Sequence, residues 1–323
     1  MSLNRKKFIA LATALVAGGA MAQGYPAKPI TLVVPAAAGG TTDLAGRMLA
    51  QALTPVVGQQ VVVDNKAGGN GAIAASLVKR APADGYTLLM QYSGYHVISP
   101  HLMKQQQWEL ADFQPIANVL SAPQIIVVRD DVPARTLAEL VAYAKANPGK
   151  INRGSPGAAI LSNLAPVAFE QSVGISTNHI PFNGDAQAIQ AMLSGSIDIY
   201  GTSITSSLPH IKSGKFRVLG VMGAQRLPQA PDGPTFKEQG YNFEAPLRYY
   251  LSTRSGAPKE TVDHLNKAIN EVLKDPAFIE RAHAVGMEPR GTTPQEMDKL
   301  LNEEIGRWNP MVKSLNLPKS DKS

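Results

Sequence analysis

Three segments of the sequence combine residue types that suit the binding of a small anion. Each has an apolar run, a turn containing glycine and then a helical pattern: VVPAAAGGTTDLAGRM from Val33, DNKAGGNGAIAASLV from Asp64 and NRGSPGAAILSNLA from Asn152. Glycine lets backbone N–H groups approach a ligand closely, and the N-terminus of a helix carries a partial positive charge. The pattern predicts anion-binding loops, although a plain glycine turn with a threonine cap would use the same residues.

Polar residues also follow other apolar runs. Asn183 and Asp185 occupy a fourth turn ahead of a helical pattern, in PFNGDAQAIQAML. The segment LRYYL contains Arg248, which could hold a carboxylate through two hydrogen bonds or could form an ordinary surface ion pair. These residues extend the predicted anion site beyond the glycine turns.

Other chemistries lack the residues that they need. Gly69-x-Gly71-x-x-Ala74 fits a relaxed dinucleotide-binding pattern, but the next apolar run ends in Gln91 and Tyr92, not in the acid that would bind a ribose. No Gly-Lys-Ser/Thr follows a glycine turn, G-x-S-x-G and H-E-x-x-H are absent, and the six histidines are scattered. The absence of cysteine excludes thiolate catalysis. We therefore expect a binding protein without a metal or cofactor, with a secreted enzyme as the weakest alternative.

The N-terminal residues have the features of a cleaved secretory signal peptide. Residues 5–7 are positively charged, residues 8–20 are apolar, and Ala20-Met21-Ala22 forms a small-x-small cleavage site. A membrane anchor is the alternative, but it needs about 20 apolar residues. Residues 5–7 supply three of the formal charges in a total of +6. The remaining chain has no concentrated basic stripe, which argues against nucleic-acid binding.

Apolar runs and helical patterns alternate along the rest of the chain. Predicted strands span residues 30–35, 60–64, 87–92, 124–129, 177–181, 197–200, 216–222 and 249–253. This alternation predicts an α/β fold with parallel sheets covered by helices on both faces, and ligands that bind where the strands end. About 300 residues is long for a single core, so we expect two lobes.

Four segments resemble the substrate-binding receptors of tripartite tricarboxylate transporters, the Bug receptors: YPAKPITLVVPAAAGGTTDLAGRMLAQAL, VVVDNKAGGNGAIAASLVKRAPADGYTLL, SSLPHIKSGKFRVLGV and RLPQAPDGPTFKEQGY. The resemblance covers Tyr25 to about Pro318. It implies a two-lobed periplasmic binding protein of type II, a Venus-flytrap that closes on a small carboxylate. In that family, the loops that match residues 36–43 and 155–158 face each other and hold one carboxylate through backbone amides, hydroxyl groups and waters.

Departures from the family suggest a roomier and more apolar pocket. Family members usually carry an aromatic residue after the proline of the first loop, where this chain has Ala36. The usual polar stretch after the third loop becomes AAILSNLAPVAF, and the acid often found near residues 198–201 gives way in part to YGTSITSS. These changes favour an aromatic or similarly long dicarboxylate, with terephthalate as the first candidate and aliphatic dicarboxylates left open. Arg248 or His96 would hold the second carboxylate, and Tyr95 and Tyr249 would flank the ring.

The residue patterns and the family resemblance together predict the domain bounds and the ligand-binding residues. Lobe 1 comprises residues 25–121 and 247–318, lobe 2 comprises residues 122–246, and residues 1–22 are the signal peptide. We expect a monomer in the periplasm that delivers its ligand to membrane transporter subunits; a receptor of the same fold that signals to a membrane sensor is the alternative. The predicted ligand-binding residues are Ala36, Gly39, Gly40, Thr41, Thr42, Asp43, Tyr92, Ser93, Tyr95, His96, Ser155, Pro156, Gly157, Ala158, Asn183, Asp185, Thr202, Arg248 and Tyr249.

Overall fold

The computed structural model describes residues 24–39, 41–68, 71–94, 101, 107–156, 160–182 and 184–314. The predicted signal peptide lies outside these residues, and so do six predicted binding residues: Gly40, Tyr95, His96, Gly157, Ala158 and Asn183. Within the described residues, no helix has the length and apolar composition that crossing a membrane requires.

Strands and helices alternate through most of the described chain. The strands are β1 (Ile30–Val34), β2 (Val61–Asn65), β3 (Thr87–Tyr92), β4 (Phe113–Arg129), β5 (Asn152–Ser155), β6 (Asn178–Pro181), β7 (Ile199–Ser203), β8 (Phe216–Val221), β9 (Pro246–Arg254) and β10 (Glu288–Pro289). The helices are α2 (Thr41–Val57), α3 (Ala72–Arg80), α5 (Leu137–Ala146), α6 (Leu161–Val173), α7 (Asp185–Leu193), α8 (Ile204–Lys212), α9 (Lys259–Val272), α10 (Pro276–Ala284) and α11 (Pro294–Ser314), with a short 3-10 turn at Leu110–Asp112.

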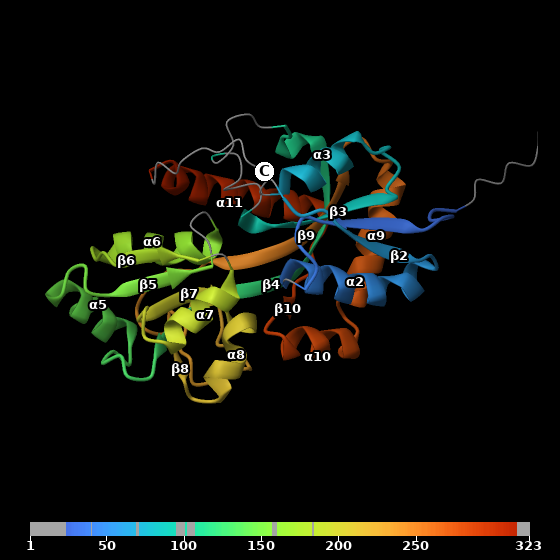
Figure 1. Ribbon diagram of the computed structural model, residues 1–323. Helices are drawn as coiled ribbons and strands as arrows, with labels where there is room; N and C mark the ends of the chain where they lie inside the picture. The colour runs from blue at the N-terminus through green and yellow to red at the C-terminus, as the bar shows by residue number, and fades with distance from the viewer. Residues whose placement is uncertain are drawn as a thin grey trace, which may run out of the picture.

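The molecule has two lobes that share the long strand β4 (Figure 1). Residues 113–123 of β4 pair with β9, in the lobe that also contains β1, β2 and β3. Residues 124–129 pair with β7 and β8, in the lobe that also contains β5 and β6. One strand therefore carries the chain from the first lobe into the second, and β9 runs beside it.

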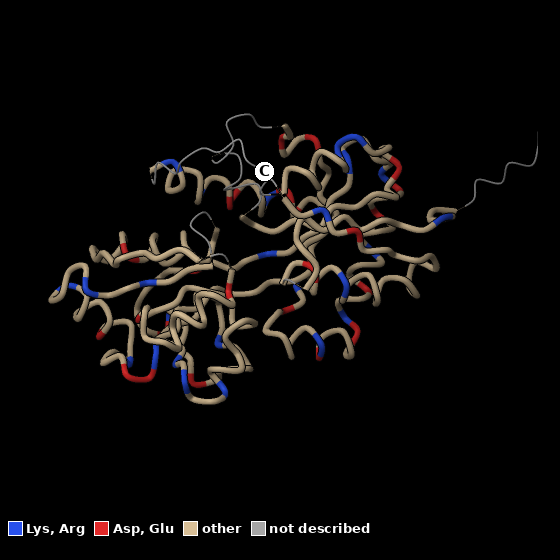
Figure 2. The backbone as a smooth tube through the Cα atoms, viewed as in Figure 1, with Lys and Arg blue, Asp and Glu red and all other residues tan. Residues whose placement is uncertain are grey.

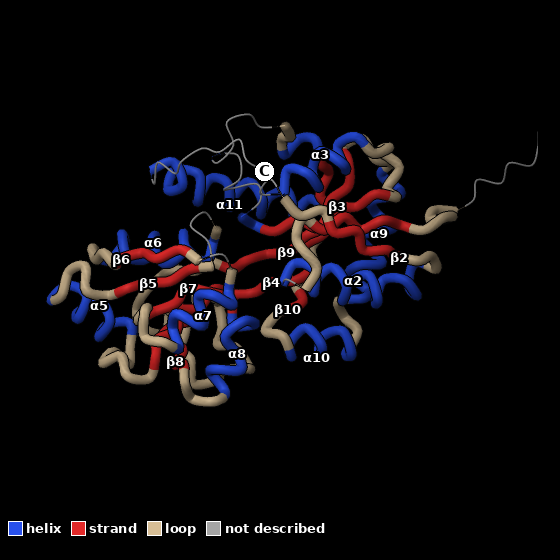
Figure 3. Tube along the Cα trace, viewed as in Figure 1, coloured by secondary structure: helices blue, strands red, loops and turns tan. Residues whose placement is uncertain are grey.

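The sheet is mixed, whereas the sequence predicted parallel pairing throughout. Its strand order is β2-β1-β3-β9-β4-β7-β5-β6, with β8 and β10 also paired to β4. Pairing is parallel among β1, β2 and β3 and among β5, β6 and β7, but β9 is antiparallel to β3 and β4, and β4 is antiparallel to β7. Figure 3 shows the strands running through both lobes with helices on either side.

Apolar alternation in β4 divides the core of the second lobe. Ile126 and Val128 join one buried cluster, while Ile125 and Val127 join another on the opposite face. Successive side chains of a strand point to opposite faces, so a run of four β-branched residues fits only a strand covered on both sides. Acidic and basic residues, by contrast, are interspersed over both lobes (Figure 2).

Helix α11 contacts both lobes. Near its start, Met297 and Leu301 form a buried cluster with Tyr250 of β9, and near its end Trp308 and Val312 belong to a core cluster of the second lobe. In between, Glu304 forms an ion pair with Arg248 of β9. The final turns of the helix thus pack against the second lobe, whereas the predicted bounds assign residues 247–318 to lobe 1.

Candidate ligand-binding cleft

A cavity of about 280 Å³ lies between residues of the two lobes. Its lining combines the first turn of α2, the ends of β3 and β7, strand β9, and the starts of α6 and α7. The lining residues are Thr41, Thr42, Tyr92, Pro156, Ile160, Leu161, Ser162, Gly184, Asp185, Thr202, Ser203, Leu247 and Tyr249. No lysine, arginine or histidine occurs among these described lining residues, so the charge of the cleft depends on its backbone and on Asp185.

Four helices begin at this cavity. Helix α2 starts at Thr41, and Ile160, Gly184 and Ser203 are the N-cap residues of α6, α7 and α8. At none of these three positions does an N-cap side chain accept a hydrogen bond from a backbone N–H of the helix. The first N–H groups of a helix have no partner within the helix, so they can donate to a ligand, and the helix dipoles add positive potential at the same place.

Asp43 fixes the first loop against α2. Its carboxylate accepts hydrogen bonds from the Gly39 N–H at 2.8 Å, from Arg47 Nε at 2.9 Å and from Asn65 Nδ2 at 2.8 Å. Asn65 Nδ2 also donates to the Ala36 carbonyl at 3.0 Å. Burial alone would raise the pKa of Asp43, but these hydrogen bonds hold that pKa below its usual value. Asp43, Gly39 and Ala36 therefore shape the loop, and they are not among the residues that line the cavity.

The second lobe contributes a network of hydroxyl groups around Asp185. Its Oδ1 accepts hydrogen bonds from Thr202 Oγ1 at 3.0 Å, from Ser206 Oγ at 3.1 Å and from the Tyr200 hydroxyl. Burial, together with the neighbouring Asp185 carboxylate, raises the pKa of Tyr200, so its phenol stays protonated and donates. Beside this network, Ser162 Oγ donates to Gln124 Oε1 at 2.6 Å.

Tyr92 and Tyr249 form an aromatic wall on the side of the first lobe. They are directly opposite each other in the pairing of β3 with β9, so their side chains lie on the same face of the sheet. Both line the cavity, and Leu247, two residues earlier on β9, lines it as well. Burial raises the pKa of Tyr249 and keeps its phenol neutral.

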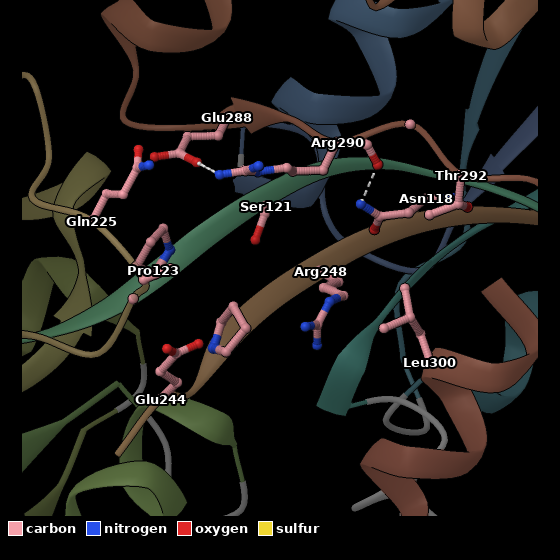
Figure 4. A pocket seen from close by; sticks show the side chains of 14 residues that line it. Asn118, Ser121, Pro123, Gln225, Glu244, Arg248, Glu288, Arg290, Thr292 and Leu300 are labelled. Carbon is pink, nitrogen blue, oxygen red and sulfur yellow. Dashed lines mark hydrogen bonds and ion pairs between the residues drawn. The ribbon is translucent and has the colours of Figure 1, made fainter. Parts of the chain in front are cut away.

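Arg248 lies on the opposite face of β9 from this wall. Because side chains alternate along a strand, Leu247 and Tyr249 face the cleft while Arg248 lines a second cavity of about 310 Å³ (Figure 4). Ser93 Oγ accepts a hydrogen bond from the Arg248 N–H at 2.9 Å and donates to Glu304 at 3.2 Å. The structure thus places Arg248 and Ser93 at the anchor of α11, and Arg248 is not among the described residues that line the cleft.

Ser155 is the last residue of β5. It is fully buried, and its Oγ is 2.8 Å from His179 Nε2. Behind it, the buried Arg153 donates to Glu170 Oε1 at 2.8 Å and to Asn163 Oδ1 at 2.7 Å. Burial, with a smaller contribution from Arg153, lowers the pKa of His179 to about 4. These residues support the start of α6, and Ser155 is not among the lining residues.

The low pKa of His179 predicts how stability depends on pH. An unfolded histidine has a pKa of about 6.5, so folding favours the neutral ring, and this contribution is complete above about pH 6.5. It should be lost as the pH falls toward about 4, where the folded protein takes up the proton. Titration of the His179 ring by NMR should give a midpoint well below 6; a midpoint near 6.5 would contradict the contact between Ser155 and His179.

The predicted site residues thus fall into three groups. Those that line the cleft are Thr41, Thr42, Tyr92, Pro156, Asp185, Thr202 and Tyr249. Those that the structure describes but does not place in the lining are Ala36, Gly39, Asp43, Ser93, Ser155 and Arg248. The remaining six lie outside the described residues. Lining residues absent from the predicted set are Ile160, Leu161, Ser162, Gly184, Ser203 and Leu247.

A cavity between two α/β lobes, with helix N-termini converging on it, defines a two-lobed solute-binding protein. A family model, "Tripartite tricarboxylate transporter family receptor", matches residues 45–317. BugT of Bordetella pertussis is 32% identical over 308 residues, which cover 94% of each chain. The structure of periplasmic binding protein BugD is similar, with 33% identity and a TM-score of 0.76, covering 92% of this chain and 100% of BugD. That of R. palustris Rpa4515 with adipate has 29% identity and a TM-score of 0.80, with 92% and 100% covered.

The chain therefore belongs to the tripartite tricarboxylate transporter receptor family, which includes the Bug receptors. Members of this family are periplasmic solute-binding receptors. This assignment confirms the resemblance and the fold class expected from the sequence.

Proposed function

We propose that this protein captures a small organic carboxylate in its cleft and delivers it to a tripartite tricarboxylate transporter. The observation that carries the proposal is the convergence of four helix N-termini on a cavity whose described lining has no basic side chain. The N–H groups and dipoles at the starts of these helices suit an anion, and a carboxylate matches them because it accepts several hydrogen bonds at once. The similarity to Rpa4515, whose structure contains adipate, supports the same class of ligand.

The body of the ligand should be apolar and flat. The cavity lining has an aromatic part, formed by Tyr92 and Tyr249, and an aliphatic part, formed by Leu247, Ile160 and Leu161. A ring between them would gain stacking contacts of about 0.5–1.5 kcal/mol beyond its burial. Terephthalate stays the first aromatic dicarboxylate to test, although its second carboxylate would find no basic partner among the described lining residues.

The topology supports a hinge between the lobes. Lobe 1 would comprise residues 25–121 and 247–318, lobe 2 residues 122–246, and the chain would cross near Ala122 and Pro246. Pro123 of β4 and Pro246 of β9 are directly paired, so both crossings lie side by side. A carboxylate bound in the cleft would draw the N-terminus of α2 toward the N-termini of α6 and α7. This closure would take place within one monomer.

Export requires that the N-terminal segment be a signal peptide, so the mature chain should begin near Gln23. The basic residues 5–7, the short apolar stretch and Ala20-Met21-Ala22 support this. Mass spectrometry of protein recovered from the periplasm should give the mass of the shortened chain; recovery of intact Met1 there would contradict it.

Calorimetric titration with benzoate, terephthalate, adipate and malate tests the function and the position of the site. At least one of these acids should bind, and Thr41→Ala or Thr42→Ala should each weaken that binding about 10- to 100-fold, because a hydrogen bond to a charged group is worth about 1.5–3 kcal/mol. Ser213→Ala, far from the cleft in a surface turn after α8, is the control. Binding that survives both threonine substitutions unchanged would place the ligand elsewhere.

A further inference from the structure

Asp185 is the one acidic residue in the described lining of the cleft. It opens α7, and its Oδ1 is surrounded by the hydroxyl groups of Tyr200, Thr202 and Ser206. All three hydrogen bonds go to the same oxygen. Among the described residues, no hydrogen bond or ion pair engages Oδ2, so this oxygen remains an acceptor available to a molecule in the cavity.

The network also fixes which way the carboxylate can interact. The Tyr200 phenol is kept protonated, and Thr202 and Ser206 hold Oδ1 from two further directions. The side chain is therefore pinned in one orientation by its neighbours. An ionised carboxylate can only accept hydrogen bonds, so Oδ2 presents negative charge and no donor to the ligand.

The opposite side of the cleft has a different character. Thr41 and Thr42, at the start of α2 in the first lobe, supply hydroxyl groups, and the first N–H groups of that helix can donate to an anion. The cleft thus combines donors from the first lobe with the Asp185 carboxylate from the second. Its volume of about 280 Å³ suits a single ring with one small substituent at each end.

We propose that Asp185 makes the cleft selective for a carboxylate whose far end carries a hydrogen-bond donor, such as a hydroxyl, amide or ammonium group. This inference rests on the proposed function and refines its ligand class. A second ionised carboxylate at that end would meet the charge of Asp185 without a described basic residue to offset it. A hydroxyl or amide of the same size would instead donate to Oδ2.

Four acids that share a benzoate ring and differ only at the para position test this selectivity in the mature protein: benzoate, 4-hydroxybenzoate, 4-carbamoylbenzoate and terephthalate. In the wild type, the hydroxyl and amide compounds should each bind at least about 10-fold more tightly than terephthalate. A difference of this size corresponds to one charge-assisted hydrogen bond. In Asp185→Asn, Oδ1 can still accept from its three neighbours, but an NH₂ group replaces Oδ2. Terephthalate should then gain about 10-fold, and the advantage of the two donor compounds should disappear.

Benzoate and a distant charge change are the controls. Benzoate has no far-end substituent, so an unchanged benzoate affinity shows that Asp185→Asn leaves the fold and the first carboxylate site intact. Asp130→Asn removes the same charge from the surface of the second lobe, where Asp130 pairs with Arg217, and should leave all four affinities unchanged. If benzoate binds but terephthalate equals the amide in both proteins, the role of Asp185 is wrong while the receptor function stands; if none of the four acids and neither adipate nor malate binds the wild type, both fail.

Discussion

Replacing Asp43 with alanine should weaken carboxylate binding by about 100-fold and destabilise the protein. The Asp43 carboxylate holds the Gly39 N–H, Arg47 and Asn65, and through Asn65 it reaches the Ala36 carbonyl. Without the Asp43 carboxylate, the ligand would have to order the loop that contains Ala36 and Gly39. Fixing two residues costs about 2–4 kcal/mol, and about 2.7 kcal/mol corresponds to 100-fold in affinity.

Two variants separate this role from simple loss of charge. Asp43→Asn keeps an oxygen for the Gly39 N–H and should lose less affinity than Asp43→Ala. Asp64→Ala removes a partly exposed acid from β2, where it pairs with Lys66, and should change neither binding nor stability appreciably. Equal affinities for wild type and Asp43→Ala, measured by titration calorimetry, would show that the loop needs no such support.

The lowered pKa of Asp43 gives the same prediction a pH dependence. A depressed folded-state pKa means that the stabilisation is complete above the unfolded value of about 3.9 and is lost as the pH falls through the lower folded value. The difference in unfolding free energy between wild type and Asp43→Asn should therefore be constant above about pH 5 and should shrink below pH 4. A difference that grows on acidification would contradict the hydrogen-bond network.

Arg153→Ala should cost about 3–5 kcal/mol of stability, the largest loss expected from any single substitution considered for this protein. Arg153 is 1% exposed and pairs with the buried Glu170, and it also donates to Asn163 in the first turn of α6. Removing it would leave Glu170 buried without its cation, and uncompensated buried charges have costs of this size. Urea denaturation with linear extrapolation measures the loss.

An exposed ion pair provides the matched control for Arg153. Arg226 pairs with Glu238, and both side chains are nearly half exposed, so Arg226→Ala should cost less than about 1 kcal/mol. Replacing Arg153 and Glu170 together with methionine and leucine should recover part of the loss, because no lone charge then remains buried. Comparable losses for Arg153→Ala and Arg226→Ala would mean that the buried network contributes no more to the free energy of unfolding than an exposed ion pair.

The sequence predicted short, continuously apolar elements well and the strand that joins the lobes poorly. Strands β1, β3 and β8 lie within one residue of their predicted bounds. Only residues 124–129 of β4 were predicted, because Pro115, Asn118 and Pro123 interrupt the preceding apolar pattern. The structure tolerates this segment through register shifts against β9 near Pro115 and Asn118, which local sequence does not reveal.

The candidate site was predictable where it depends on local pattern. Thr41, Thr42, Pro156 and Asp185 stand at turns between strand and helix, and all four line the cleft. Ile160 could have been included by the same rule, since it occupies the N-cap position of the helix that follows the third turn.

Residues whose roles depend on distant contacts could not be predicted in this way. Asp185 meets Tyr200 and Ser206 only after the lobe has folded. Strand alternation next to Tyr249 would have directed Arg248 away from the cleft, but its partner Glu304 lies on a helix 56 residues later. Charge and side-chain length alone therefore do not reveal the ion pair that this arginine forms.

The most direct test of the carboxylate site is a crystal structure of the mature protein with whichever acid of the titration panels binds most tightly. We expect one carboxylate of the ligand to lie in the cleft, within hydrogen-bond distance of the N–H groups or hydroxyl groups at Thr41–Thr42 and at the start of α6, with the ring or chain beside Tyr249. A ligand bound instead in the cavity beside Arg248 and Arg290, with the cleft between the helix N-termini left to solvent, would contradict it.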